Sequence, residues 1–563
     1  MRDQSSLRAR HDRRLQDLKS RRSRWESHWR ELAEYVSPKR WRDESRDDIG
    51  GDKERQKILD GSATLALRTL ASGMHSGITS PARPWFRLAT LDPDMRENGE
   101  VRTYLQQVED RMRHVMATSN LYRGFHSGYA DLGLMGQFAG LLTKDDTHYV
   151  SLMTFIHGEY WIANGLDGRA ETLYRRCRMT VEQMMRRFGT RCSNTVQNMY
   201  DRSQYDERVT VYHAVERRHD RDPSKPDKRN MPWLSNYWEE GATGDNMLGE
   251  SGFRSNPILA PRWLTIGSDE YGQSPGMEAL PDVKGLQIKE QRKLEAIDKM
   301  VRPPMKGPTS LKNEPKSLLP GSITYVDDPN GQGYTPAMQV TLRIAELAQD
   351  IAETRDRINR AFYADLFMML QNLEGVQPRN VYELTKRQEE QLLQLGPVLE
   401  NVYYELLEPT INTVFEACNE ARILPPPPRD LEGKELKIEY ISTLAQAQKA
   451  VATGSIERLA GFIGNLAGGR PEVLDKLDAD QAVDVYADMI GAPPDIVVAD
   501  DRVAEIRKQR TEMMQQQAQA EQAAKLAPAA NQGANAIATL AQTDAGGGQP
   551  VQDFLANLGI SGP

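Results

Sequence analysis

A short stretch with the letters of a hydrolase motif lies at residues 272–276, Gly-Gln-Ser-Pro-Gly. In a serine hydrolase, G-x-S-x-G places the nucleophile between a buried strand and a helix, and the residue after the serine donates its backbone N–H to the oxyanion hole. Here that residue is Pro275, which has no N–H. The segment before it, WLTIGSDEYG, carries glycine and two acids where a buried apolar run is needed. A serine hydrolase using Ser274 is therefore kept only as a remote alternative.

The same residues fit the start of a helix. Ser274 is a good N-cap, whose hydroxyl accepts a hydrogen bond from an unpaired backbone amide. Pro275 is favoured at the first helical position, and Glu278 in the first turn suits the helix dipole. Gly272 and Gly276 allow a neighbouring segment to come close. The sequence therefore predicts a capped helix that begins at this point.

Other signs of chemistry are scarce. The sequence contains neither a phosphate-binding G-x-x-x-x-G-K-[ST] loop nor a zinc-binding H-E-x-x-H motif. His213 and His219 stand six residues apart beside a charged loop, and we expect both to be solvated. The acidic pairs at 145–146 and 500–501 fit turns or helix ends better than a metal site. We expect no enzyme, no catalytic residue, no metal and no cofactor.

Composition narrows the class of protein. The net charge of −8 over 563 residues argues against a protein that coats DNA, although DNA could slide past it. Cys177, Cys192 and Cys418 show neither zinc nor disulfide spacing, which favours a reducing compartment. The first residues lack the apolar segment of a signal peptide, and no run of about 18 apolar residues predicts a membrane span.

Residues 1–42 predict an amphipathic helix with 13 Lys or Arg against 6 Asp or Glu. Trp25, Trp29, Leu32 and Val36 recur at helical spacing. Two interpretations stay open: a solvated helix docked on a core, or a helix whose arginine face binds nucleic acid.

Residues 60–88 predict a buried helix, in which Gly73 and Gly77 allow close approach and two prolines end the helix. Residues 100–142 predict two more helices. The strands THYVSLMTFI and RAETLYRRCRMT flank an Asn-Gly turn, and RVTVYHAVERR and PWLSNYWEE predict a second hairpin. Thr180 and Gln183 form a capping box before a short helix that Gly189 closes. Residues 1–265 thus predict one α+β domain, helices first and strands after.

Two long charged helices follow. The first covers residues 275–300, with Leu294, Ile297 and Val301 on one face. Residues 301–336, rich in Pro, Gly and Lys, predict a small excursion, and one helix about 50 Å long runs from about residue 337 to 371. Each helix carries one apolar stripe, so the pair cannot form a core alone. Copies packed side by side in a ring could bury both stripes.

The last part of the chain is more broken. LEGVQPRNVYELTKRQ interrupts the helical pattern, and a further helix contains Leu399 and Leu406. The four prolines at 425–428 predict a stiff boundary, followed by the strand KELKIEYIS. Residues 442–500 predict helices, and the Gln- and Ala-rich end becomes low in complexity over its last 35 residues or so.

Two long stretches resemble a known family. DGSATLALRTLASGMHSGITSPARPWFRL and YGQSPGMEALPDVKGLQIKEQRK are similar to signature segments of the portal proteins, or head-to-tail connectors, of short-tailed T7-like bacteriophages. The match continues to EYISTLAQAQKA and covers roughly residues 20–455. The resemblance implies a mostly helical α+β portal fold that assembles as a ring, typically of twelve subunits, at one capsid vertex in the virion.

The resemblance also implies a division into parts. Residues 1–265 and 361–440 correspond to the wing, with a channel loop at about 373–388. Residues 266–300 and 337–360 correspond to the two stem helices and 301–336 to the clip. The crown would cover 441–500, and a barrel helix with a flexible tail 501–563. In this scheme Gly272, Ser274, Pro275 and Gly276 start the first stem helix.

The implied partners are other copies of the chain, double-stranded DNA in the channel, and the large subunit of the terminase that pumps it. Major capsid and scaffolding proteins, tail adaptor or nozzle proteins and internal core proteins complete the set. Candidate DNA contacts in the channel loop are Arg379, Lys386 and Arg387. Lys306, Lys312 and Lys316 in the clip could meet DNA or a protein partner. For each of these six residues, the alternative is a solvated side chain on the surface. For the function of the whole chain, the alternative is another phage tail adaptor or a ring or scaffold protein.

Overall fold

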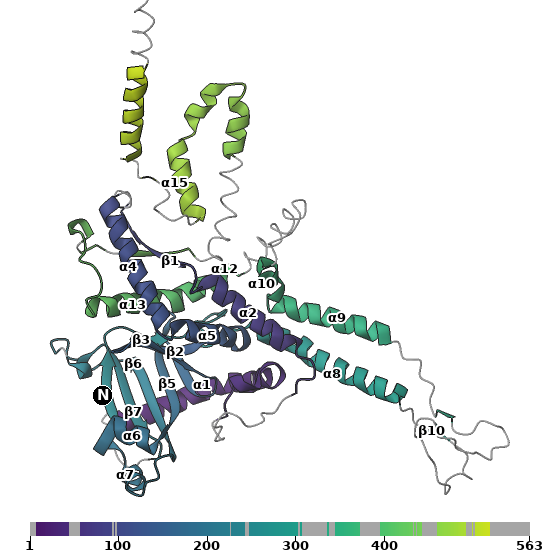
Figure 1. Cartoon of the computed structure of the whole chain (residues 1–563). Coiled ribbons are helices and arrows are strands. Elements are labelled where there is room, and N and C mark those ends of the chain that lie inside the picture. Colours follow the sequence, from purple (N-terminus) through teal and green to yellow (C-terminus); the bar gives the residue numbers. More distant parts are fainter. Residues whose placement is uncertain are drawn as a thin grey trace, which may run out of the picture. The chain divides into compact units, whose positions relative to one another are not determined.

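Figure 1 shows the computed structural model of the chain. The chain consists of two compact units, one of residues 1–92 and 100–491 and one of residues 93–99 and 492–563. The structure describes residues 7–43, 57–92, 95, 98–225, 227–241, 247–301, 305–306, 335–336, 344–371, 395–431, 433–434, 436–441, 459–490, 498 and 502–517.

Four helices from the first part of the chain build much of the core. They are α1 (Leu7–Val36), α2 (Ser62–Ile78), α4 (Gly99–Thr118) and α5 (Leu121–Met135), with the 3-10 turn η1 (Pro38–Arg40) after α1. α2 packs against α5 because small residues line its buried side. A Cβ on Gly73 would lie 2.1 Å from Cγ of Phe367, so only glycine lets α10 (Ala364–Gln371) cross here.

Two antiparallel sheets follow these helices in the chain. The sheet of five strands has the order β4-β5-β6-β7-β8 and the sheet of three the order β3-β2-β9. Their strands are β2 (Ala139–Asp145), β3 (Tyr149–Phe155), β4 (Tyr160–Asn164), β5 (Ala170–Thr180), β6 (Arg208–Arg217), β7 (Trp233–Glu239), β8 (Gly249–Phe253) and β9 (Ile258–Leu259). The predicted β6–β7 hairpin is confirmed, with His213 opposite Tyr237.

Between β5 and β6 lie α6 (Val181–Phe188), η2 (Gly189–Arg191) and α7 (Asn194–Asp201), and η3 (Lys228–Asn230) precedes β7. The predicted capping box is confirmed, since Thr180 Oγ1 accepts from Gln183 N at 3.2 Å and Gln183 accepts from Thr180 N at 3.1 Å. These helices cover one end of the large sheet with a small apolar cluster that includes Met184 and Phe188.

Two predictions about this region are wrong. The second of the predicted helices over 100–142 ends at Met135, where Gly136 takes a left-handed conformation with φ of 81°, and residues 139–145 form β2. His213 is not solvated but is 1% exposed. Its ring stacks on Tyr237 at 3.8 Å, accepts from Arg175 Nε at 3.1 Å and lies 2.9 Å from Ser235 Oγ. The inward register of β6, rather than the nearby charged loop, decides its environment.

The helical hairpin consists of α8 (Pro275–Val301) and α9 (Ile344–Ala361), which lie side by side. Between them, β10 (Met305–Lys306) pairs with β11 (Thr335–Pro336). The prediction of one continuous helix over 337–371 is wrong, because Tyr363 has a φ of 54° and separates α9 from α10. Residues 337–343 lie outside the described ranges.

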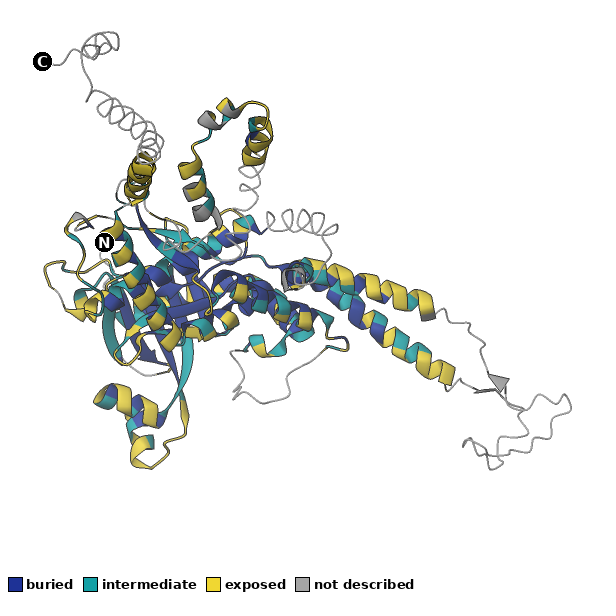
Figure 2. Ribbon diagram, turned by 45° about the horizontal axis from the view of Figure 1, so that its top comes forward, coloured by how far each residue is buried: buried dark blue, intermediate teal, exposed yellow. Residues whose placement is uncertain are grey.

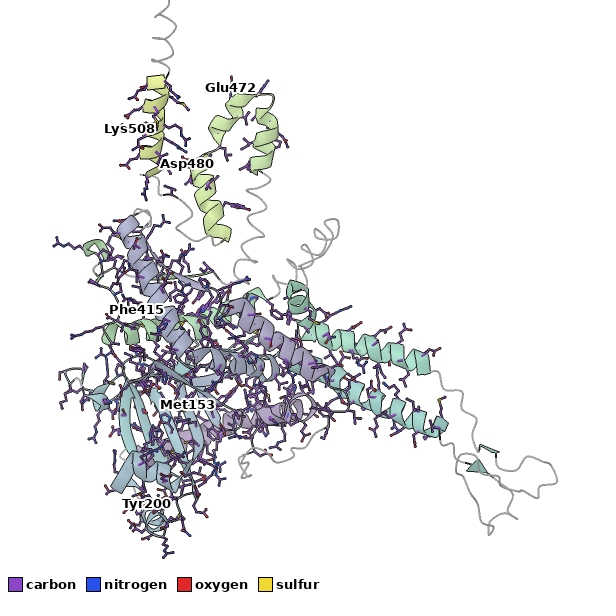
Figure 3. All side chains as sticks on the ribbon, in the orientation of Figure 1. Met153, Tyr200, Phe415, Glu472, Asp480 and Lys508 are labelled. Atoms are coloured by element: carbon purple, nitrogen blue, oxygen red, sulfur yellow. The ribbon has the colours of Figure 1, made fainter. Side chains whose placement is uncertain are left out.

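Among the described residues, eight further elements follow in the first unit, and those up to β12 contribute side chains to the core. They are α12 (Gly396–Val402), the π-helical turn η5 (Tyr403–Leu407), α13 (Glu408–Glu420), η6 (Arg429–Leu431), β12 (Leu436–Tyr440), a helix over 459–467, η7 (Pro471–Lys476) and α15 (Ala479–Ile490). The four prolines do not separate two units, because β12 beyond them pairs with β1 (Phe86–Thr90), Phe86 opposite Tyr440. In the second unit, residues 502–517 form a helix with almost every side chain exposed, including Lys508 (Figure 3).

Candidate functional site: the α8–α9 hairpin and its anchorage

The start of α8 is locked into the body by Ser274. Its Oγ accepts from Met277 N at 3.1 Å and donates to Leu134 O at 2.7 Å, and the side chain is 1% exposed. α8 begins at Pro275, as the capped start predicted. The hydroxyl of Ser274 therefore both donates and accepts a hydrogen bond within the folded chain. A buried serine with these two partners does not support the remote hydrolase alternative.

Glycines bring two segments into contact at this junction. A Cβ on Gly276 would lie 2.6 Å from Leu134 O, and a Cβ on Gly272 would lie 2.3 Å from Gly136 O. Gly136 itself has a φ of 81°, and a Cβ there would meet Gly272 O at 2.2 Å. Backbone atoms cannot move aside as a flexible side chain can, so these three positions require glycine.

A second anchor joins α8 and α9 to the segment before α2. Gln287 Oε1 accepts from Leu59 N at 2.6 Å and Asp60 N at 2.8 Å, while its Nε2 donates to Asp60 O at 3.1 Å. Arg355 of α9 donates to Asp60 Oδ2 at 2.6 Å and to Glu290 Oε1 at 2.8 Å. One guanidinium thus holds both helices of the hairpin and the body together.

Electrostatics at this anchor favours an ionised Asp60. Burial by itself would raise the pKa of Asp60, but hydrogen bonds from Ser62 and Arg355, together with the Arg355 charge, outweigh burial and lower that pKa. Further along the pair, Lys289 of α8 donates to Asp350 at 2.8 Å and to Thr354 at 2.9 Å. These polar contacts add to the packing of the buried Ile351 and Ile358 of α9 and help to set the register of the two helices.

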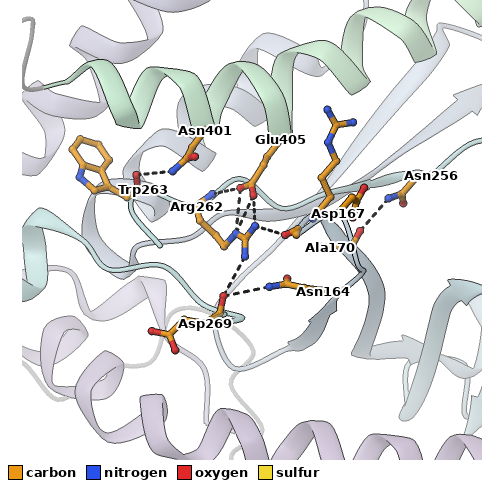
Figure 4. Close-up of polar contacts among 11 residues, drawn as sticks. Asn164, Asp167, Ala170, Asn256, Arg262, Trp263, Asp269, Asn401 and Glu405 are labelled. Carbon is orange, nitrogen blue, oxygen red and sulfur yellow. Dashed lines mark hydrogen bonds and ion pairs between the residues drawn. The ribbon is translucent and has the colours of Figure 1, made fainter. Parts of the chain in front are cut away.

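A third anchor is a buried ion pair just before α8 (Figure 4). The side chains of Arg262 and Glu405 are 6% and 9% exposed, and the Arg262 guanidinium donates to the Glu405 carboxylate. The backbone N of Arg262 also donates to Glu405 Oε2 at 2.9 Å. Glu405 lies in the π-helical turn η5, and Arg262 Nη1 reaches Asp269 O at 3.2 Å. Because each charge has several partners, the pair is satisfied although it is withdrawn from water.

The break between α9 and α10 is also part of the anchorage of the hairpin. Trp263, next to Arg262, packs on Tyr363 with ring centroids 5.8 Å apart. Trp263 is 5% exposed, and Tyr363 is the residue with the left-handed conformation. The turn of the chain out of α9 is therefore stabilised by an aromatic contact with the segment that leads into α8.

The outer half of the hairpin is different (Figure 2). The buried positions of α8 end at Glu290. Beyond that point Leu294, Ile297, Met300 and Val301 are 55%, 38%, 54% and 72% exposed. Side chains line both helices up to their outer ends (Figure 3), and among the described residues the core does not extend to those of α8. The apolar face that the sequence predicted on this helix is thus uncovered in one subunit.

The contacts of the other predicted residues stay a prediction. Arg379, Lys386, Arg387, Lys312 and Lys316 lie outside the described residues. Lys306 is in β10, where only the backbone is described. Sequence reasoning missed Asp60, Gln287, Arg355, Arg262 and Glu405. Their contacts with one another join residues 143 to 295 positions apart and leave no local signal.

Within the described ranges, no group of three or more His, Cys, Asp or Glu side chains could hold a metal ion. No helix in the part of the chain that the structure describes is long and apolar enough to cross a membrane.

Comparison with known proteins identifies the family. The model of the bacteriophage head to tail connecting protein family matches residues 8–497. The chain belongs to this family. Among its relatives, the "Probable portal protein" of Bordetella phage BPP-1 is 47% identical over 94% of each chain. The "Portal protein" of Salmonella phage epsilon15 is 44% identical over 94% of this chain and 95% of its own. The family is a structural one, and its role is to connect head and tail rather than to catalyse a reaction.

Solved structures resemble the chain only distantly. A chain from the neck of an empty gene transfer agent particle covers 77% of this chain and 89% of its own length, at 13% identity and a TM-score of 0.36. That TM-score is too low to carry an argument about the arrangement of this molecule.

Proposed function

We propose that this member of the connector family forms a ring of twelve subunits at one capsid vertex of a phage, with an axial channel for double-stranded DNA. The family match and the portal proteins that share 44–47% identity support this role. The single observation that carries the ring is the uncovered apolar stripe on the outer half of α8.

The exposed apolar stripe on the outer half of α8 and the anchored start of that helix both fit assembly into a ring. Fully burying a Leu, Ile or Val side chain stabilises by about 1.5–3 kcal/mol, so the stripe offers several kcal/mol per contact when a neighbour covers it. The neighbour would use a different face, and contacts between unlike faces close into rings when the rotation between subunits divides a full turn. The anchored base fixes the direction of the hairpin, as a closed ring needs.

In this proposal the hairpin is the stem, residues 301–336 the clip, and residues 1–265 with 361–440 the wing. Residues 441–500 form the crown, and residues from 501 on form a barrel and tail. Terminase during packaging and tail adaptor proteins afterwards meet the clip, while capsid, scaffolding and internal core proteins contact the wing and crown. The chain then resides in the host cytoplasm during assembly and at the portal vertex of the virion afterwards.

The channel loop, about residues 373–388, supplies the DNA-contacting candidates Arg379, Lys386 and Arg387. We expect Arg379→Ala to leave ring assembly intact and to change DNA packaging or retention in particles. Variants that no longer form rings would contradict the channel assignment, because a loop in the lumen has no part in subunit contacts. Lys306, Lys312 and Lys316 are the corresponding candidates in the clip.

The deciding experiment measures the mass of the purified full chain in solution and images it by negative-stain electron microscopy. A ring of about twelve subunits with an axial hole is the expected result. A chain that stays monomeric up to high concentration contradicts the proposal. A closed ring without a hole, or one found away from the DNA-entry vertex in particles, favours the adaptor or scaffold alternative.

A further inference from the structure

The first half of α1 concentrates positive charge in an acidic protein. Residues 7–24 contain eight Lys or Arg against two Asp, whereas residues 25–36 contain one Arg against three Glu. The whole chain has a net charge of −8. Within α1, the basic character is therefore a property of the first half of the helix.

The structure divides these cations between two faces of α1. Arg22 is 2% exposed, donates to Tyr160 O at 2.5 Å and lies over the Trp161 ring at 4.4 Å. Lys19 lies over the same ring at 5.0 Å, and Arg8 lies over Trp238 at 5.9 Å. Leu15 and Leu18 pack between them on the five-stranded sheet. This inner face accounts for the docking of the helix.

The outer face consists of Arg10, Arg13, Arg21 and Arg24, all of them exposed. Their spacing of 3, 8 and 3 residues keeps them on one side of the helix over about 21 Å. Arg21 pairs with Glu270 at 2.8 Å and is still 55% exposed. The docked helix and the arginine face predicted from the sequence as alternatives are thus two sides of the same helix.

We infer that this arginine stripe, Arg10, Arg13, Arg21 and Arg24, binds the phosphate backbone of a nucleic acid duplex without reading its sequence. A duplex presents about 12 phosphates over the 21 Å of the stripe, and the planar guanidinium bonds phosphate oxygens in pairs. The site lies on one helix of the first unit, far in the chain from the channel and clip candidates. Binding is expected of the chain whether or not it forms a ring.

The chemistry of the face favours nucleic acid over an acidic protein. Stable protein interfaces need apolar or aromatic anchors at their centre. The positions between the arginines on this side include Ser20 and one acid, Asp17. α1, which is described over its whole length, shows no large apolar side chain among the exposed ones. Contacts to a phosphate backbone require only charge and hydrogen bonds.

The test measures binding of the full chain to a fluorescein-labelled DNA duplex of about 20 base pairs between about 50 and 200 mM salt. Replacing all four stripe arginines by glutamine should weaken binding at least about 100-fold and lower the salt slope by up to about 3 to 4, one for each lost phosphate contact. Replacing the same four by lysine should retain most of the affinity, which guards against loss of folding as the cause.

The matched control replaces four other exposed arginines, Arg186, Arg191, Arg202 and Arg208, by glutamine. It changes the net charge equally and should leave affinity and slope close to the original. Equal loss in the stripe variant and the control would overturn the inference, and so would tighter, stripe-dependent binding of poly-glutamate than of duplex. The mass of each variant in solution is measured in parallel, so that failure to form rings is distinguished from failure to bind.

Discussion

The inner and outer halves of the α8–α9 hairpin belong to the same two helices but are stabilised in opposite ways. The inner half is held by Ser274, by Gln287 and Arg355, and by the nearby Arg262–Glu405 pair. The outer half has exposed Leu294 and Val301 and short-range ion pairs such as Arg292–Glu295. Among the described residues, the inner half has its polar groups paired, whereas the outer half leaves its apolar side chains exposed.

This contrast separates what a single subunit determines from what assembly determines. Substitutions in the inner half should change the free energy of unfolding of the single chain. Substitutions in the outer half should change association and leave unfolding almost untouched. Four substitutions, from the largest expected effect on stability to the smallest, test whether the inner half governs unfolding and the outer half association.

Arg262→Met should give the largest loss, about 3–5 kcal/mol in the free energy of unfolding, because Glu405 would remain buried without its counter-charge. Urea denaturation of the chain at fixed concentration measures the loss. The double variant Arg262→Met/Glu405→Leu should recover much of it, since it removes both charges. A single variant as stable as the original chain would show that the anchor contributes nothing.

Ser274→Ala should cost about 2 kcal/mol, because it removes the helix cap and leaves the Leu134 carbonyl without its donor. The exposed Ser268→Ala is the matched control and should change stability little. Thermal unfolding compares the two. Equal melting temperatures would mean that water replaces both hydrogen bonds at no cost.

Asp60→Asn should cost about 1–2 kcal/mol near neutral pH, since the carboxylate loses its charged bond to the partly exposed Arg355. The lowered pKa of Asp60 in the folded chain means that its contribution is present above the unfolded pKa of about 4 and is lost as the pH falls through the folded pKa. The difference between the two proteins, measured by denaturation from neutral to acidic pH, should therefore shrink on acidification. A constant difference would assign the effect to packing and not to charge.

Leu294→Ser/Val301→Ser should change the unfolding free energy of the single chain by less than about 0.5 kcal/mol, because both side chains are exposed. The same variant should shift the mass distribution in solution from rings toward monomers. Leu166→Ser/Leu264→Ser replaces exposed apolar side chains elsewhere and should not affect association. If both variants assemble equally well, the outer half is not the subunit contact.

The features that could be predicted from the sequence are those fixed by neighbours in the chain. The Ser274 cap and the Thr180–Gln183 box depend on residues within three positions, and the structure contains both. The β6–β7 hairpin followed from alternation over adjacent strands. In the two caps local backbone geometry decides the outcome, and in the hairpin the alternation of apolar and polar side chains does.

The features that could not be predicted depend on distant partners. The helical spacing of apolar residues continues across Tyr363, so nothing local marks the break that Trp263 stabilises. His213 looked solvated beside its loop, but Arg175 and Tyr237 on the neighbouring strands enclose it. The Arg262–Glu405 pair joins residues 143 positions apart. The candidate DNA contacts at 379–387 remain predictions, since they lie outside the described residues.

The pairing of β1 with β12 can form only late in the synthesis of the chain. These strands lie about 350 residues apart in the chain, and Phe86 meets Tyr440 only once both have left the ribosome. At about 5–20 residues per second, β1 waits roughly 20–70 seconds for its partner. The hairpin is made within that interval, before the body that carries it is closed. A truncated product ending before Leu436 thus leaves β1 with an unpaired strand edge, which favours aggregation of the incomplete subunit.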